Sequence, residues 1–161
     1  MTEQVYNRAR AVAYAQKWAF SRNPAFLNFD GMGGDCTNFA SQCLYTGSGI
    51  MNYTDTFGWY YRSSRDRSPS WTGVPYLYNF LISNKSVGPY AVQTDAQQVL
   101  PGDLVQLGTA AGQFYHSPVI VAADGDDIYV AAHTDDAYMR PLSSYTYDQA
   151  RFLHIVGVRH W

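Results

Sequence analysis

Apolar residues at helical spacing mark the beginning of the chain. Over residues 3–20, apolar side chains recur every three or four positions between polar ones, which is typical of a helix with one buried face. Thr2 precedes this segment as a typical N-cap residue. Asn23-Pro24 follows it, and proline disfavours helical backbone in the residue before it. We therefore predict a first helix over residues 3–20.

A second helix is predicted after the glycine-rich turn at residues 31–34. Asp35 is a typical N-cap residue, and the helix should run to about Tyr45 and be closed by Gly47. Four apolar side chains of this segment fall at i, i+3, i+4 and i+7, which predicts one buried stripe made of Cys36, Phe39, Ala40 and Cys43.

The second half of the chain changes to strand-like patterns. After an irregular segment at residues 48–71, Pro75 opens a third helix. Short apolar runs beyond residue 100 then predict strands at 104–107, 117–123, 128–132 and 152–158, with a hairpin turn at 124–127. Helices followed by strands indicate an α+β fold with an antiparallel sheet. We find no linker or repeat, so one domain over residues 1–161 is the simplest account.

The composition excludes several classes of function. Hydrophobic residues make up 47% of the 161 residues and charged ones 15%, which is typical of a globular chain. A net charge of -2 gives no reason to expect a nucleic-acid partner. No apolar run is long enough to cross a bilayer, so we expect no membrane span, and the first residues lack the apolar block of a signal peptide.

Cys36 is the candidate nucleophile. It directly follows the predicted N-cap Asp35, where unpaired backbone N–H groups and the helix dipole favour a thiolate, so we expect a lowered thiol pKa. Cys43 lies near the other end of the same helix and is interpreted as a core residue. On one helix the two cysteines are about 10 Å apart, which is too far for a disulfide.

The histidines supply candidates for the base. His116 begins a predicted strand, and His133 ends the strand that pairs with it. A turn centred on Gly125-Asp126 would bring His116, His133 and Asp135 to one end of the hairpin, as a base and its orienting partner require. His154 and His160 are expected to be structural. Zinc binding by Cys36 with this cluster is a weaker alternative, since no CxxC or HExxH spacing is present, and we expect neither a metal nor another cofactor.

Several local motifs resemble known cell-wall hydrolases. The Asp35-Cys36-Thr37 segment, the turn at residues 100–105 and the strand that starts at His116 resemble the NlpC/P60 group. The whole chain more closely resembles the "putative amidase domain" family, which we take to be related to the NlpC/P60 and CHAP hydrolases. Besides residues 35–43 and His116-Ser117, the matching features are Tyr6-Asn7-Arg8, Tyr14-Ala15, Asn23-Pro24, Ser70-Trp71-Thr72, Ala132-His133-Thr134 and Arg140-Pro141-Leu142.

The resemblance implies a papain-like fold and hydrolysis of amide bonds in bacterial peptidoglycan or its stem peptides. Cys36 would be the nucleophile, His116 the general base and His133 the third polar residue, with Asp135 as its competitor. The implied location is extracellular or cell-wall associated, and we expect a monomer. The alternative is a catalytically inactive wall-binding module of the same fold.

Three further residues are candidates for binding substrate. Asp35 caps the helix and, by the same resemblance, would contact a substrate amine. Trp59 and Trp71 lie in the irregular segment, where aromatic side chains suit stacking against glycan or peptide, although ordinary packing explains them equally well.

Overall fold

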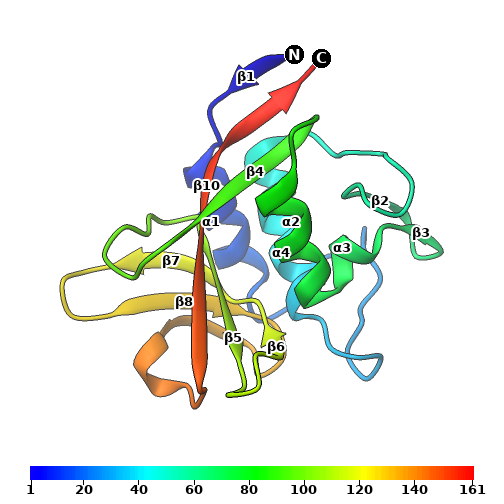
Figure 1. The fold of residues 1–161 in the computed structure, drawn as a ribbon. Coiled ribbons are helices and arrows are strands. Elements are labelled where there is room, and N and C mark those ends of the chain that lie inside the picture. Colours follow the sequence, from blue (N-terminus) through cyan, green and yellow to red (C-terminus); the bar gives the residue numbers. More distant parts are fainter.

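The computed structural model describes all residues 1–161 (Figure 1). The helices are α1 (Arg8–Trp18), α2 (Cys36–Ser48), α3 (Pro69–Thr72) and α4 (Val74–Ser83), and a short 3-10 helix, η1, covers Leu142–Ser144. The strands are β1 (Thr2–Gln4), β2 (Tyr61–Ser63), β3 (Asp66–Arg67), β4 (Gly88–Thr94), β5 (Leu104–Gly108), β6 (Phe114–His116), β7 (Val119–Ala123), β8 (Ile128–Ala132), β9 (Ala137–Pro141) and β10 (Gln149–His160). No helix combines the length and the apolar character that a membrane span requires.

Eight strands form one antiparallel sheet. Its main path is β1-β10-β5-β7-β8-β9, while β4 pairs with β10 and β6 pairs with β5. The long strand β10 holds three others, because β1, β4 and β5 all pair with it. Strands β2 and β3 form a separate two-stranded hairpin. The molecule is thus a mixed helix and sheet structure whose strand pairs are all antiparallel.

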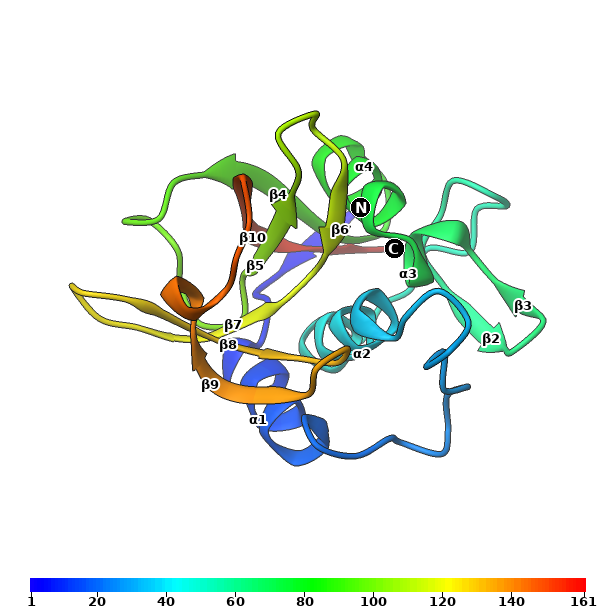
Figure 2. The ribbon, with the colours of Figure 1, turned by 90° about the horizontal axis from the view of Figure 1, so that it is seen from below.

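Two hydrophobic clusters cover the two faces of this sheet. The larger one joins the helices to the inner face and includes Phe39 and Leu44 of α2 and Leu153 of β10. The smaller one lies on the outer face and includes Val105 and Ile120. Helix α2 lies in the middle of the molecule, next to α1 and α3 (Figure 2), and eleven of its 13 residues are buried. The predicted single stripe was therefore too narrow, because α2 has neighbours on all sides.

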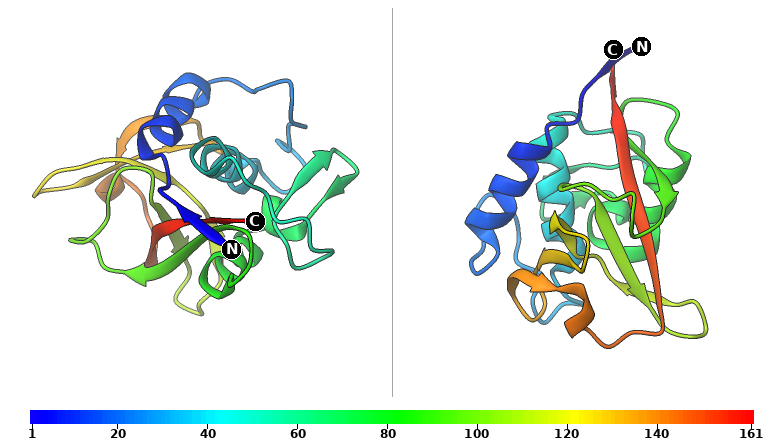
Figure 3. Two further views of the ribbon diagram at one scale, coloured as in Figure 1. Left: turned by 90° about the horizontal axis from the view of Figure 1, so that it is seen from above. Right: turned by 90° about the vertical axis from the view of Figure 1, so that its left-hand side faces the viewer.

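The first helix begins later than predicted. Asn7, and not Thr2, is the N-cap of α1, and its side chain accepts a hydrogen bond from the Arg10 N–H. Thr2–Gln4 instead forms β1, paired with the end of β10. The pairing partner is more than 150 residues away, so local periodicity could not reveal it. As a result the two chain ends lie side by side, opposite the end that carries β9 and η1 (Figure 3).

Helix α2 also ends later than predicted. Gly47 lies inside the helix, and a Cβ there would come within 2.5 Å of the Tyr6 ring, so this glycine allows a close approach of the N-terminal segment. The helix closes at Gly49, which is left-handed at φ 70° and donates its N–H to the Tyr45 carbonyl.

The strand predicted at residues 117–123 begins later, and His116, which was predicted to begin a strand, ends one instead. Strand β6 ends at His116 and β7 begins at Val119, with Ser117 and Pro118 between them. The hairpin turn at residues 124–127 is confirmed, since Ala123 pairs with Ile128 across it. Strands β4 and β9 were not predicted. The β9 segment lacks a clear period of two, and Met139 within it is left-handed at φ 57°.

The Pro101-Gly102 turn is tied to the start of α1. The Tyr6 hydroxyl donates a hydrogen bond to the Gly102 carbonyl, and the Arg8 guanidinium pairs with the fully buried Asp103 at 2.8 Å. Asp103 also accepts a hydrogen bond from the Ile155 N–H of β10. These contacts fix the start of β5 and, through the sheet, the strands that follow it.

Candidate active site

Cys36 stands at the first turn of α2, as the sequence predicted. The chain enters the helix through Gly34, which is left-handed at φ 99° and whose added Cβ would lie 3.2 Å from the Thr134 hydroxyl oxygen. The Asp35 carbonyl accepts the first helical hydrogen bond, from the Phe39 N–H. The Asp35 N–H itself points to the Thr134 hydroxyl at 3.4 Å. The loop after β8 therefore lies directly against the start of the helix.

The Asp35 carboxylate does not have the roles predicted for it. It is 1% exposed and makes no capping hydrogen bond to the first turn of α2. One oxygen accepts from the Phe29 N–H and the Asn38 side-chain amide, and the other contacts His133. Both oxygens are thus occupied inside the protein, so the predicted contact with a substrate amine is wrong for this conformation. The first amides of α2 are left without a side-chain cap.

His133 belongs to this buried network. Its Nδ1 lies 2.5 Å from the Asp35 carboxylate, its Nε2 lies 2.7 Å from the Trp18 carbonyl, and its ring stacks on Phe39 at 4.0 Å between centroids. Both facing oxygens are acceptors, so both contacts are hydrogen bonds only when the ring carries two N–H groups. Neither nitrogen is free to orient His116, which contradicts the role favoured for His133.

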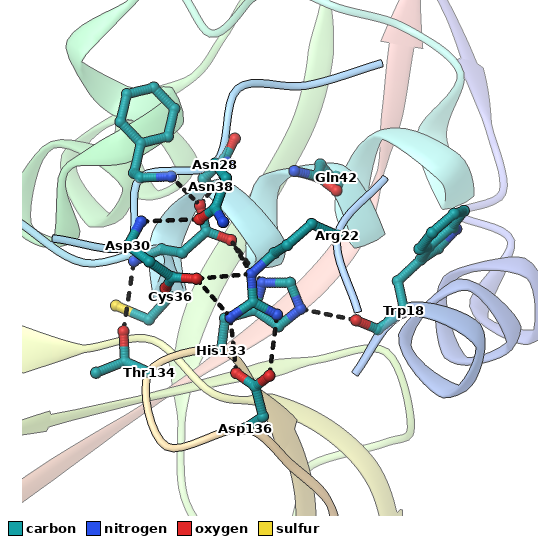
Figure 4. A network of polar contacts seen from close by, with 12 residues as sticks. Trp18, Arg22, Asn28, Asp30, Cys36, Asn38, Gln42, His133, Thr134 and Asp136 are labelled. Carbon is teal, nitrogen blue, oxygen red and sulfur yellow. Dashed lines mark hydrogen bonds and ion pairs between the residues drawn. The ribbon is translucent and has the colours of Figure 1, made fainter. Parts of the chain in front are cut away.

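Arg22 closes the network toward solvent (Figure 4). Its guanidinium forms two hydrogen bonds with Asp136 and another with Asp30. It also lies 3.6 Å from the Asp35 oxygen that contacts His133, the inner oxygen of this carboxylate. Burial raises the pKa of Asp35, but the hydrogen bonds from His133, Asn38 and the Phe29 N–H outweigh it, so the pKa is below its ordinary value. The network therefore holds an ionised carboxylate beneath Cys36.

The Cys36 thiol is itself largely buried, at 7% exposure. Burial raises its pKa, and the nearby Asp35 carboxylate acts in the same direction. The Thr37 hydroxyl and the backbone N–H groups of Ser117 and Thr37 oppose this rise without cancelling it. The predicted lowering of the thiol pKa is therefore wrong, since desolvation exceeds the effect of the helix start. Cys43 is fully buried in the core, as predicted.

Two hydroxyl groups join the Cys36 helix to the His116 strand. Thr37 Oγ1 lies 3.2 Å from Ser117 Oγ, and both side chains are buried. Ser117 Oγ also accepts a hydrogen bond from the side-chain amide of Gln106, which in turn accepts from Arg151. The residues directly after Cys36 and directly after His116 are thus in contact, which brings the start of α2 to the end of β6.

His116 lines a cavity of about 300 Å³. It pairs with Leu107 of β5, is 7% exposed, and shares the cavity with Thr134, Asp135, Arg140 and Tyr145, among others. Burial, followed by the positive charge of Arg140, lowers the pKa of His116 to about 4, while Asp135 acts in the opposite direction. The imidazole is therefore neutral near pH 7, as a general base must be. Of the two candidates for the third catalytic residue, Asp135 and not His133 is the one whose charge affects the pKa of His116.

The two tryptophans do not line a groove. Trp59 and Trp71 are both fully buried and pack against each other at 4.9 Å between centroids. The Trp59 indole N–H donates to Ser41, and the Trp71 indole N–H donates to Asn38. Their predicted contact with substrate is wrong, because they form the core around α2 instead.

The remaining histidines make local contacts. His154 is half-buried and its Nδ1 lies 3.0 Å from Asp103, while His160 lies by the C-terminal Trp161. Nowhere does the structure gather three or more histidine, cysteine, aspartate or glutamate side chains in an arrangement that could hold a metal ion.

Comparison with known proteins gives the family. Residues 5–156 match the family model described as "Putative amidase domain". The chain belongs to this family. Its description places the chain among amidase-type hydrolases. A Bacillus subtilis (strain 168) relative, described as uncharacterized protein YhbB, is 38% identical over 140 residues, which is 84% of this chain and 43% of the relative. The chain thus spans less than half the length of this relative, and no solved structure matches the chain.

Several residues of the site were missed by the sequence reasoning. Thr37, Ser117 and Arg140 stand inside motifs that were noticed, and two of them directly follow the predicted nucleophile and base. The signal in the sequence was that each of the two predicted reactive residues, Cys36 and His116, is directly followed by a residue with a hydroxyl group. Arg22 gave no signal, because its partner Asp136 is 114 positions away in the chain.

Proposed function

We propose that this amidase-domain protein is a cysteine hydrolase of amide bonds in bacterial peptidoglycan, with a papain-like arrangement related to the NlpC/P60 and CHAP hydrolases. The observation that carries the proposal is the contact between Thr37 and Ser117, which brings together the segments that hold Cys36 and His116. A thiol at a helix start beside a neutral imidazole is the arrangement that acyl transfer through a thioester uses. The site of action would be outside the membrane, at the cell wall.

The resting site holds a thiol and a neutral imidazole, and not a preformed ion pair. His116 then takes the Cys36 proton as the sulfur attacks the carbonyl carbon. The oxyanion accepts hydrogen bonds from the first amides of α2, which the Asp35 carboxylate leaves uncapped. His116 next protonates the leaving amine, and water releases the acyl group from sulfur. This cycle requires no metal or organic cofactor.

Asp135 is the proposed third residue. It lines the cavity with His116, and its charge raises the pKa of that imidazole against the effects of burial and Arg140. His133 acts indirectly. It holds the Asp35 carboxylate away from the start of α2, so the first backbone N–H groups of this helix stay free to bind the oxyanion.

The rival function is a wall-binding module without activity. The raised pKa of the Cys36 thiol is the observation that favours it, since a buried thiol is a weaker nucleophile at neutral pH. The contact between the Cys36 and His116 segments favours the enzyme.

Digestion of purified peptidoglycan by wild type, Cys36→Ala and Cys43→Ala tests the proposal, with released fragments identified by mass spectrometry. We expect wild type and Cys43→Ala to release fragments whose masses name the bond cut, and Cys36→Ala to release none. Cys43→Ala is the matched control, because it removes the other buried thiol of the same helix. Release by Cys36→Ala would exclude the thioester mechanism. No release by wild type from several wall types would favour the binding module.

A further inference from the structure

The cavity beside His116 contains an arginine without a counter-ion. Arg140, on β9, lines this cavity. None of the ion pairs in the structure includes it, whereas four other arginines pair with carboxylates: Arg8, Arg22, Arg62 and Arg159. Asp135 lies in the same cavity but does not come within 4.0 Å of the guanidinium nitrogens. A positive charge therefore faces the cavity uncompensated at close range.

Neutral groups hold the Arg140 side chain in place. Its Nε donates to Ser144 Oγ at 2.8 Å, and one Nη donates to the Ser144 carbonyl at 3.2 Å. The guanidinium lies over the Tyr145 ring, with its central carbon 3.6 Å from the ring centroid. These contacts fix the plane of the group and leave the other Nη without a hydrogen bond in the protein. An arginine oriented in advance loses less entropy when it binds an anion.

The backbone of β9 is distorted next to this arginine. Met139 adopts a left-handed φ of 57°, and the register with β8 shifts between Val130 and Ala132. Bulges of this kind re-aim a side chain, and left-handed backbone is strained in a residue other than glycine. The strained backbone at Met139 thus directly precedes Arg140 and directs its side chain toward the cavity that His116 lines.

We propose that Arg140 binds a carboxylate of the substrate beside the amide that is cut, which makes acidic peptides the preferred substrates. This inference rests on the proposed function and names its substrate class. Arginine recognises carboxylates through paired, charge-assisted hydrogen bonds, and no carboxylate of the protein itself occupies this one.

Carboxylate binding at Arg140 also affects the base. After burial, the Arg140 charge is the largest cause of the low pKa of His116. A bound carboxylate offsets that charge, so the pKa of His116 rises and the imidazole becomes a stronger base. An acidic substrate thus strengthens the group that activates Cys36, whereas a neutral one leaves it weak.

Binding is tested without catalysis in Cys36→Ala protein. The probes are N-acetyl-L-alanyl-D-glutamate and its neutral diamide, which have the same length. Binding and the His116 pKa are followed by NMR of the imidazole resonances, assigned with His116→Gln. We expect the acid to bind on the order of 10- to 100-fold more tightly than the diamide and to raise the His116 pKa.

Variants of two arginines decide whether Arg140 is responsible. Arg140→Gln should remove the preference for the acid, and Arg140→Lys should keep part of it, because it retains the charge without the planar fork. Arg159→Gln is the matched control, since the Arg159 guanidinium also lies 3.6 Å from the centroid of a tyrosine ring, but the residue pairs with Glu3 near the chain ends. Equal binding of the two probes, no saturable binding of the acid, or a preference that survives in Arg140→Gln would overturn the proposal.

The subsite and the reaction can fail separately. Arg140-dependent binding of the acid without hydrolysis of any wall would leave the subsite standing and overturn the proposed function. Hydrolysis by wild type together with equal binding of the acid and the diamide would leave the proposed function standing and overturn the subsite.

Discussion

Replacing His133 by phenylalanine should strongly destabilise the fold. The new ring keeps the stack on Phe39, but the inner Asp35 oxygen and the Trp18 carbonyl both lose their hydrogen-bond donor. Removing the partner of a buried charge costs about 3–5 kcal/mol. Arg22, 3.6 Å from the same Asp35 oxygen, compensates in part, so we expect a loss of about 3 kcal/mol in the free energy of unfolding.

For a chain of this length, that loss lowers the Tm by roughly 6–12 °C. The measurement is urea unfolding followed by circular dichroism at pH 7, with the m-value unchanged. The matched control is His154→Phe, which breaks the other aspartate–histidine pair. Because His154 is 29% exposed, its loss should cost no more than about 1 kcal/mol.

The pH dependence gives a second check on the same variant. The pKa of Asp35 is lowered on folding, so the stability that its partners provide is complete above the unfolded-state pKa and is lost as the pH falls through the folded-state value. The gap between wild type and His133→Phe should therefore narrow as the pH falls below about 4. A gap under about 1 kcal/mol at pH 7, or one that widens on acidification, would refute this account of the network.

Two further predictions concern the reactive groups. The acidic limb of the pH profile of kcat/KM should have its midpoint near pH 4, because the base must be neutral and burial, followed by the charge of Arg140, lowers the pKa of His116 to about 4. Asp135→Asn removes the opposing negative charge and should move this limb to lower pH, whereas a shift to higher pH would contradict the role of Asp135. Iodoacetamide should alkylate Cys36 more slowly than a free cysteine at pH 7.5, with a rate that still rises at higher pH, because burial raises the pKa of the Cys36 thiol. Cys43 should react only on unfolding. A Cys36 alkylation rate that reaches a plateau below pH 7 would show a lowered thiol pKa instead.

Local patterns predicted much of the fold. The start of α2 after a glycine-rich turn, the start of α4 at a proline and the turn between β7 and β8 all follow from signals that act on near neighbours, although the Asp35 side chain does not cap α2. The placement of β1 could not be predicted this way, because its partner strand is at the other end of the chain. The same limit applies to β4, which is held by the far part of β10.

The candidate site shows the same division. The position of Cys36 at a helix start followed from the sequence because it depends on local structure, and so did the place of His116 at the edge of a strand, although His116 ends β6 and does not begin β7. The partners of Asp35 and His133 did not, because residue type alone does not say whether a carboxylate faces an amide, a histidine or solvent. Trp71 was misplaced for a related reason: an aromatic residue in an irregular segment is equally able to line a groove or to fill a core.

The pairing of β1 with the end of β10 has a practical consequence. The two chain ends lie together, at the opposite end of the molecule from the strand that carries Arg140 (Figure 3). A short peptide could therefore join them into a closed ring without crossing the cavity beside His116. Cyclisation of this kind restricts the unfolded chain more than the folded one, so it should raise stability and leave the site open to a polymer as large as a cell wall.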